Sequence, residues 1–156
     1  MHLLPQRGYT GNGDEMKVDA QMLASLLKTT QEGKIAVRRA LYASAQPPLR
    51  CVLQTQLLEL GAIETEVHAI AAQRGWELKE IQPGRRVLMR FRMRMILRGR
   101  SDSEIAERMM RRSIHRMIAC IKVLHRYQRQ SGRISALSQR LADCEADAIR
   151  QLQTFL

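Results

Sequence analysis

The chain has few of the residues that build β-sheet cores, disulfide frameworks or zinc sites. Phe, Trp and Tyr together make up 4% of its 156 residues, and it holds only four prolines and nine glycines. Such a composition favours helix over sheet. The three cysteines are an odd number without metal-finger spacing. They argue against a disulfide framework and suit a reducing cytosol.

Long apolar runs are also lacking. No stretch approaches the ~20 consecutive apolar residues of a transmembrane segment. The apolar patch within MHLLPQRGYTGNGDE is shorter than the core of a signal peptide. We therefore expect a cytoplasmic protein of one domain, large enough to bury a core without staples. Residues 1–16 are polar and contain glycine, so they are expected to form a flexible leader before a domain at residues 17–156.

Apolar residues recur at alternating spacings of three and four along four stretches, which is typical of helices packed in a bundle. The first stretch starts at Asp19, expected as its N-cap, and ends before the prolines at 47–48. The second ends at Gly75. The third follows SDSE at residues 101–104, which has the capping-box pattern. Short connections make the helices of each pair antiparallel neighbours.

Between the two pairs, Pro83-Gly84 opens RRVLMRFRMRMILRGR, which we interpret as a short basic crossover helix. Its apolar residues form two stripes separated by arginines. One stripe consists of Val87, Leu88, Phe91 and Met95, and the other of Met89, Met93, Ile96 and Leu97. Apolar surface on two sides suits a helix packed between the bundle and a second surface. Residues 85–98 are therefore a candidate interface for a homo-oligomer.

The predicted architecture is two antiparallel helical hairpins, residues 19–73 and 102–156, joined by this crossover. The chain resembles the ferritin-like superfamily in LLKTTQEGKIAVRRALYASAQPPLRCVLQTQL, in a Glu- and His-bearing second helix, in the RGW after it, and in GRSDSEIAERM. It is similar to rubrerythrin-related bacterial proteins and, over residues 22–76, to the spore coat protein F family. The resemblance covers about 130 residues. It implies an all-α, ferritin-like four-helix bundle, and it makes a spore or surface-layer location conceivable.

Ferritin-like di-iron sites take a Glu from each of two helices and a Glu-x-x-His from each of the other two. Here Glu64 and His68 are four residues apart instead of three, and Glu145 lies at the edge of the last seam. Ser113 stands where the third helix would need a carboxylate. Glu64, His68 and Glu145 are thus the residual metal candidates. We expect no iron or manganese cofactor and no catalytic residues.

Glu64 falls on the inward seam of the second helix, where an isolated carboxylate would be costly. We expect it to bond to Thr30, Gln31 or a basic side chain across the seam. A single-metal ligand or an acid–base group is the functional alternative. Cys120 and Cys144 also fall on seams, and they are expected to be small core residues instead of redox thiols.

The net charge of +11 is concentrated in residues 85–133, which we call the basic segment. It carries fifteen Arg or Lys against three acidic residues, so the other 107 residues sum to −1. Such a segment can bind a polyanion or an anionic lipid surface. The candidate binding residues are Arg86, Arg90, Arg92, Arg94, Arg98, Arg108, Arg111, Arg112 and Arg126. Alternatively the segment is a solvated face, balanced by acidic residues of the other helices: Glu59, Glu64, Glu66, Asp143, Glu145 and Asp147.

Three functions therefore remain open. The favoured one is a non-catalytic ferritin-like structural or assembly protein, self-associating through the crossover. The second is a module that binds polyanions or anionic membrane surfaces through the basic segment. The third is a metal-binding oxidoreductase of the ferritin type with a divergent site.

Overall fold

The computed structural model describes residues 11–44, 46–126 and 132–156. This part of the chain forms five α-helices and no strand, which confirms the all-α prediction for it. The helices are α1 (Gly11–Ala43), α2 (Pro47–Arg74), α3 (Pro83–Leu97), α4 (Asp102–Arg126) and α5 (Gly132–Gln153). Within the described ranges, no helix has both the length and the apolar character needed to cross a bilayer.

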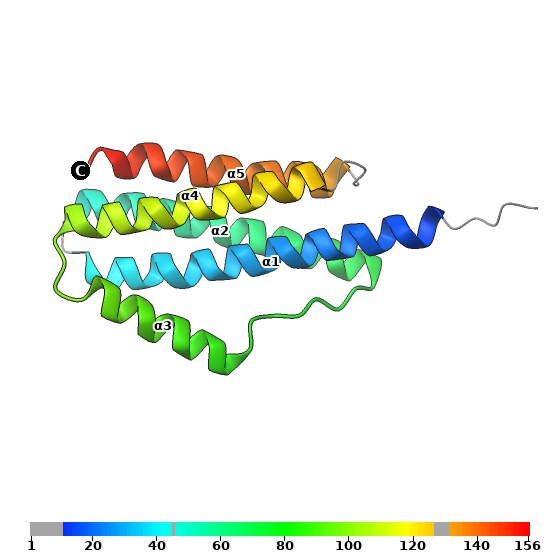
Figure 1. Cartoon of the computed structure of the whole chain (residues 1–156), viewed down its shortest axis with the longest axis horizontal. Helices are drawn as coiled ribbons and strands as arrows, with labels where there is room; N and C mark the ends of the chain where they lie inside the picture. The colour runs from blue at the N-terminus through cyan, green and yellow to red at the C-terminus, as the bar shows by residue number, and fades with distance from the viewer. Residues whose placement is uncertain (1–10, 45, 127–131) are drawn as a thin grey trace, which may run out of the picture.

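Four long helices lie side by side, and the short helix α3 lies outside them against α1 (Figure 1). α1 packs on α2 and α4 packs on α5, and the helices of each pair run in opposite directions. Contacts of α2 with α5 and of α1 with α4 hold the two hairpins together. The hairpins and the crossover helix thus occur where the sequence predicts them. The assignment to the ferritin-like superfamily stays a prediction.

Two helix ends follow the local signals in the sequence. Gly75 ends α2 in the left-handed conformation with φ 68°, and the N–H of Trp76 donates to the carbonyl of Ala71. At the start of α4, Ser101 Oγ accepts a hydrogen bond from the N–H of Glu104 at 3.3 Å, as the capping-box pattern predicts. These local signals therefore fix the end of α2 and the start of α4.

The prediction for the start of the first helix is wrong. α1 already begins at Gly11, so Asp19 lies inside it and caps nothing. The Asp19 side chain is buried and accepts a hydrogen bond from Arg74 Nη1 at 2.8 Å, which joins α1 to the last turn of α2. Of the leader expected at residues 1–16, the last six residues are helical, and residues 1–10 lie outside the described part.

The core follows the predicted seam closely in α1 and less closely in α4 and α5. The spacing of three and four predicts seven inward residues from α1 and the position directly after it, and all seven are buried: Leu23, Leu26, Thr30, Gly33, Val37, Ala40 and Ser44. In α4, Met109 and Arg116 are buried, whereas Met110 and Met117, which the spacing of three and four predicts to face inward, are only half-buried. In α5, Leu152 is buried instead of Gln151. A straight helix has 3.6 residues per turn, so its buried stripe drifts away from a strict heptad.

Candidate functional site

The three residual metal candidates do not converge. Glu64 lies beside Lys34, with 3.4 Å between Lys34 Nζ and Glu64 Oε1. His68 is exposed and lies 3.5 Å from Glu80. Glu145 lies in the core, where its partner is an arginine. In the described ranges, no three His, Cys, Asp or Glu side chains form a group that could hold a metal ion.

Glu64 is half-buried at the edge of the core and not in its centre. The buried stripe on α2 also includes Gln56, Ile63 and Ile70, beside Leu60 and Val67. The expectation that a basic side chain across the seam satisfies Glu64 is confirmed by Lys34 of α1.

The charged residue in the centre is Glu145 of α5, which is 0% exposed. Arg116 Nε donates to Glu145 Oε1 at 2.7 Å, and Arg116 Nη2 donates to Glu145 Oε2 at 3.2 Å. Gln56 Nε2 donates to the same Oε2 at 3.3 Å, and Ser113 Oγ accepts from Arg116 Nη2. We call Gln56, Ser113, Arg116 and Glu145 the core polar cluster. A bidentate pair with further hydrogen bonds compensates for the desolvation of both charges.

Gly33 of α1 makes room for this cluster. A Cβ placed on Gly33 would lie 3.3 Å from Arg116 Nε and 3.2 Å from Leu60 Cδ1. Both distances are tighter than ordinary van der Waals contact. The missing side chain at Gly33 therefore lets the guanidinium of Arg116 approach α1 closely.

The structure separates the nine arginines expected to bind polyanions into two groups. Arg86 lies 3.9 Å from Glu80, and Arg111 lies 2.8 Å from Glu107. For the other seven, no carboxylate of the described residues lies within ion-pair distance: Arg90, Arg92, Arg94, Arg98, Arg108, Arg112 and Arg126. These seven positive charges are available for an external anion.

Several acidic residues that were expected to balance the basic segment form ion pairs within the two hairpins instead. Arg140 Nε donates to Glu59 at 2.7 Å, and this hydrogen bond raises the pKa of Arg140. Asp147 pairs with Arg150 one turn along α5. The acidic residues of α2 and α5 therefore neutralise little of the charge on α3.

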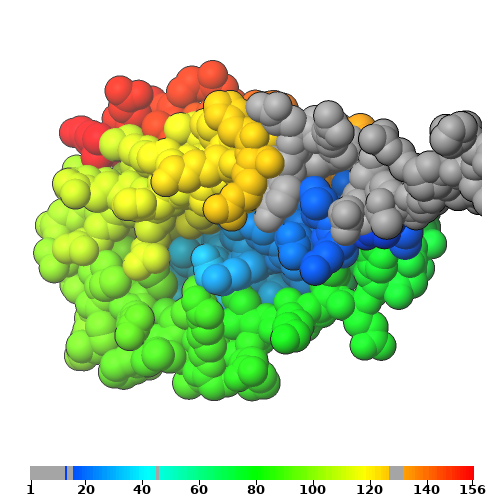
Figure 2. Space-filling view, turned by 45° about the vertical axis from the view of Figure 1, so that its right-hand side comes forward, coloured from blue at the N-terminus to red at the C-terminus, as the bar shows by residue number. Residues whose placement is uncertain are grey.

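α3 presents one apolar stripe to the bundle and the other to solvent. Met93 and Leu97 are buried, and Ile96 packs against the core. The other predicted stripe is exposed: Val87 63%, Leu88 47%, Phe91 59% and Met95 54%. We call these four residues the apolar stripe of α3. In Figure 2 the side chains of α3 stand out along the lower edge of the molecule, beneath α1.

Arginines border the apolar stripe on both sides. At about 100° per residue, Arg90 and Arg94 flank one edge of the stripe, and Arg85 and Arg92 flank the other. Residues 81–101 contain seven arginines and no acidic residue. The outer face of α3 is therefore apolar along its middle and positively charged at its edges.

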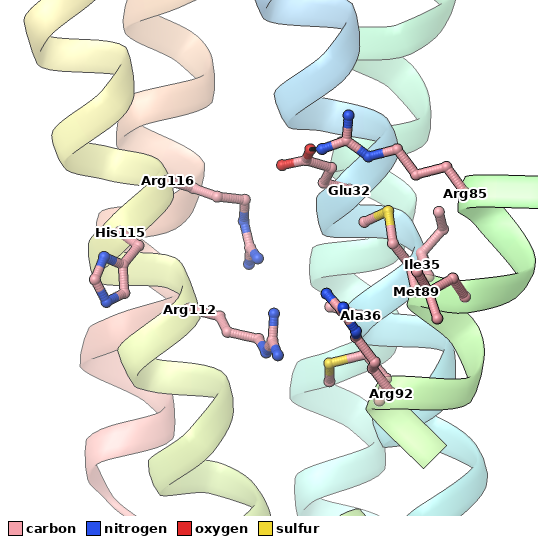
Figure 3. Close-up of a pocket in the computed structure, with 11 residues that line it drawn as sticks. Glu32, Ile35, Ala36, Arg85, Met89, Arg92, Arg112, His115 and Arg116 are labelled. Carbon is pink, nitrogen blue, oxygen red and sulfur yellow. Dashed lines mark ion pairs between the residues drawn. The ribbon is translucent and has the colours of Figure 1, made fainter. Parts of the chain in front are cut away.

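A cavity of about 480 Å³ lies beside the outer face of α3, between this helix, α1 and α4, along the edge of the stripe that carries Arg85 and Arg92. Four arginines line it, Arg85 and Arg92 from α3 and Arg112 and Arg116 from α4. Figure 3 shows the two α4 side chains extending into the gap toward α1 and α3. We call this cavity the arginine pocket.

The cysteines behave as the sequence predicts. Cys120 and Cys144 are buried, while Cys51 is exposed. Burial, together with the negative charge of Glu145, raises the pKa of Cys120 and Cys144 to about 12. A thiol that stays protonated at neutral pH is a poor nucleophile and a poor metal ligand.

Sequence reasoning missed Arg116 and placed Glu145 only at the edge of its seam. The signal was present in the spacing, because Met109, Ser113, Arg116 and Cys120 follow one another at intervals of four, three and four. An arginine at such a position is usually assigned to the surface. A buried carboxylate on another helix was needed to explain it, and Glu145 was considered only as a residual metal candidate and as one of several acidic residues balancing the basic segment.

Comparison of the chain with models of protein families, with curated proteins and with solved structures yields no match.

Proposed function

We propose that the protein is a ferritin-like helical module that binds anionic bilayer surfaces through the outer face of α3. One observation carries the proposal: an apolar stripe lies exposed on a helix in which every charged residue is an arginine. Helices that lie in the interface of a bilayer combine an apolar stripe with basic flanks in this way. The stripe would enter the acyl boundary while the arginines remain among the headgroups.

The two contributions are of similar size. Full burial of a Val, Leu, Phe or Met side chain contributes about 1.5–3 kcal/mol. Each arginine near an anionic surface adds about 1 kcal/mol. Insertion of the stripe into the headgroup region is only partial, so neither contribution alone gives firm binding. Their sum supports reversible binding that requires an anionic bilayer.

A nucleic acid fits the outer face of α3 less well than a bilayer does. The phosphates of a nucleic acid would pair with the arginines, but they would not bury Phe91 and its apolar neighbours. The stripe also lies between the two rows of arginines, where it would separate them from a rigid duplex. A bilayer satisfies both kinds of side chain together.

The second candidate is the structural or assembly protein that the sequence favours, associating with itself through α3. The exposed apolar stripe supports it as well, because a second copy could cover the stripe. However, two copies would bring the seven arginines of residues 81–101 against the same seven, without an acidic residue between them. Like charges facing one another oppose such an interface.

The test is flotation of the protein with vesicles of phosphatidylcholine alone or mixed with phosphatidylglycerol. We expect binding to the mixed vesicles only. Raising the salt from about 0.1 M toward 1 M shortens the Debye length from about 10 Å to about 3 Å. Binding should therefore fall steeply with salt, because the apolar stripe alone does not hold the protein on a bilayer.

Two double variants separate α3 from the remaining charge of the protein. Arg90→Glu with Arg94→Glu should abolish flotation. Lys122→Glu with Arg126→Glu on α4 makes the same change in net charge at the same spacing, and these residues are also exposed without a described carboxylate partner. This control should bind more weakly than the unaltered protein but remain bound. Phe91→Ser should reduce binding, whereas Leu58→Ser at an exposed site on α2 should not.

The outcomes distinguish the candidates. Equal loss in both double variants would show that the diffuse positive field acts and not α3. A salt-insensitive oligomer in light scattering, dissociated by Phe91→Ser and without affinity for vesicles, would instead support the assembly protein. Retention on neutral vesicles equal to that on anionic ones would also overturn the proposal.

A further inference from the structure

The arginine pocket is a second basic feature, which adjoins the outer face of α3 and shares Arg85, Leu88 and Arg92 with it. Its walls come from α1, α3 and α4, and it holds about 480 Å³. Small-molecule sites in proteins commonly occupy concave spaces of about this size. Four guanidinium groups and one carboxylate, Glu32, line it. The pocket therefore has the size and the charge of a site for a small anion.

Two of the four arginines already have partners. Arg85 Nη2 lies 3.7 Å from Glu32 Oε1. Arg116 is held by Glu145, which lies behind the pocket wall in the core. Its Nη1 has no acceptor among the described residues, while Nε and Nη2 are both engaged. The core polar cluster thus fixes one guanidinium at the pocket wall.

Arg92 and Arg112 have no such partner. Neither side chain has an ion pair or hydrogen bond to a described residue, and they approach the pocket from α3 and α4 respectively (Figure 3). Burial, followed by the positive charges of Arg116 and Arg108, lowers the pKa of Arg112. With Glu32 and Glu145 counted, the four arginines leave an excess of two positive charges.

The rest of the lining consists of His115 and apolar side chains, which come from Ile35, Ala36, Leu88, Met89 and Met93. Ile35, Ala36 and Met93 are buried, and Met89 is half-buried beside them. A fully hydrated inorganic ion would leave this surface unused. An anionic group attached to a compact apolar body would pair with the guanidinium groups and also cover the methionine and isoleucine side chains.

We propose that the arginine pocket binds a phosphate monoester, held by Arg92 and Arg112 against the fixed guanidinium of Arg116. A phosphate monoester carries close to two negative charges at neutral pH, which matches the excess of positive charge. Arginine pairs with phosphate oxygens through two parallel hydrogen bonds, so several guanidinium groups can share the three terminal oxygens. This proposal does not depend on the binding of bilayers by the outer face of α3.

The phosphate could belong to a soluble metabolite or to a lipid headgroup, and two probes distinguish these sources. Calorimetric titration is carried out on the full chain with phenyl phosphate and with a short-chain phosphatidic acid below its micelle concentration. Binding of phenyl phosphate that equals or exceeds that of phosphatidic acid indicates a soluble ligand. Tighter binding of phosphatidic acid indicates a lipid. Either result, dependent on Arg92 and Arg112, supports the site.

The variants Arg92→Gln and Arg112→Gln should each weaken binding by about tenfold or more, because each removes charge-assisted hydrogen bonds to phosphate. Arg126→Gln on the same helix as Arg112 removes an equal charge outside the pocket and should leave affinity within about twofold. Arg112→Lys should retain part of the affinity. Thermal unfolding without ligand checks that each variant folds, since removal of a like charge should not destabilise the protein.

The proposal is overturned if neither probe binds, or if Arg126→Gln weakens binding as much as Arg112→Gln does. It is also overturned if phenyl sulfonate, with one negative charge, binds as tightly as phenyl phosphate. The two proposals can fail independently. Arg90→Glu with Arg94→Glu should abolish flotation with vesicles and leave calorimetric binding of phenyl phosphate intact, and Arg112→Gln should do the reverse.

Discussion

Arg94 on α3 and Arg116 on α4 belong to the same basic segment but lie in opposite surroundings. Arg94 is exposed, and no described carboxylate lies within ion-pair distance of it. Arg116 is 8% exposed and makes a bidentate pair with Glu145. The difference lies in what the facing helix supplies. A guanidinium is buried where another helix supplies a carboxylate and a glycine leaves space for it. Elsewhere it stays in water, where an external anion can reach it.

Buried and exposed arginines contribute to the protein in different ways. Removing the partner of a buried charge leaves that charge without solvation, and the whole fold is destabilised. Removing an exposed charge changes stability little and changes binding instead. Stability and binding should therefore respond to different arginines of one segment.

The largest effect is expected for Glu145→Gln, which keeps the shape of the side chain but leaves Arg116 buried without a counter-charge. The free energy of unfolding should fall by about 3–5 kcal/mol. Arg90→Glu with Arg94→Glu on α3 should change it by less than about 1 kcal/mol. Denaturant unfolding followed by circular dichroism measures both.

The double variant Glu145→Leu with Arg116→Met is the control for Glu145→Gln. It removes both charges and should cost less than Glu145→Gln alone, although Gln56 and Ser113 lose partners. If Glu145→Gln were no more destabilising than the α3 double variant, the contrast between the two regions would not hold.

A second effect should appear at alkaline pH, because two thiols lie close to the core polar cluster. In the folded protein the pKa of Cys120 and Cys144 is raised from 9.0 to about 12. Above about pH 9 the unfolded chain loses these protons first, so the folded state binds more protons and is destabilised as pH rises toward 12. Unfolding free energies measured at intervals from about pH 8 to about pH 11 should fall progressively.

Cys120→Ala with Cys144→Ala should reduce this slope, even though the variant is less stable at every pH. In the unaltered protein at about pH 8, iodoacetamide should modify the exposed Cys51 and spare the two buried thiols until the chain is unfolded. Rapid modification of all three cysteines under native conditions would contradict the tight packing of the core around Glu145.

The smallest expected effect is the difference in stability between alanine substitutions at two helical glycines. Gly61 on α2 has nothing within 4 Å of an added Cβ, so Gly61→Ala should stabilise the protein by about 0.5–1 kcal/mol through helix propensity. At Gly33 the same propensity gain is opposed by contact with Arg116 and Leu60. Gly33→Ala should therefore be about 1 kcal/mol less favourable than Gly61→Ala, as measured by thermal unfolding. Equal stabilisation at both positions would show that Arg116 moves aside freely.

The local features of the fold could be predicted because their causes are local. Prolines at 47–48, Gly75 and the Ser101 capping box act on the backbone within a few residues, and the structure places helix ends there. The two apolar stripes of α3 were also visible in the spacing of its residues. By contrast, the start of α1 was predicted wrongly because Asp19 has a typical N-cap side chain but bonds to Arg74, 55 residues away.

The sequence by itself determined that the chain is helical, where most of its helices end, and that its positive charge is concentrated in one segment. Only the tertiary structure decided which arginines of that segment are buried, which line a pocket and which remain in water. The physical reason is that a side chain cannot signal its own burial when the compensating groups come from other helices. Arg116 enters the core because α5 supplies Glu145 and α1 supplies the space at Gly33, and neither lies near it in the chain.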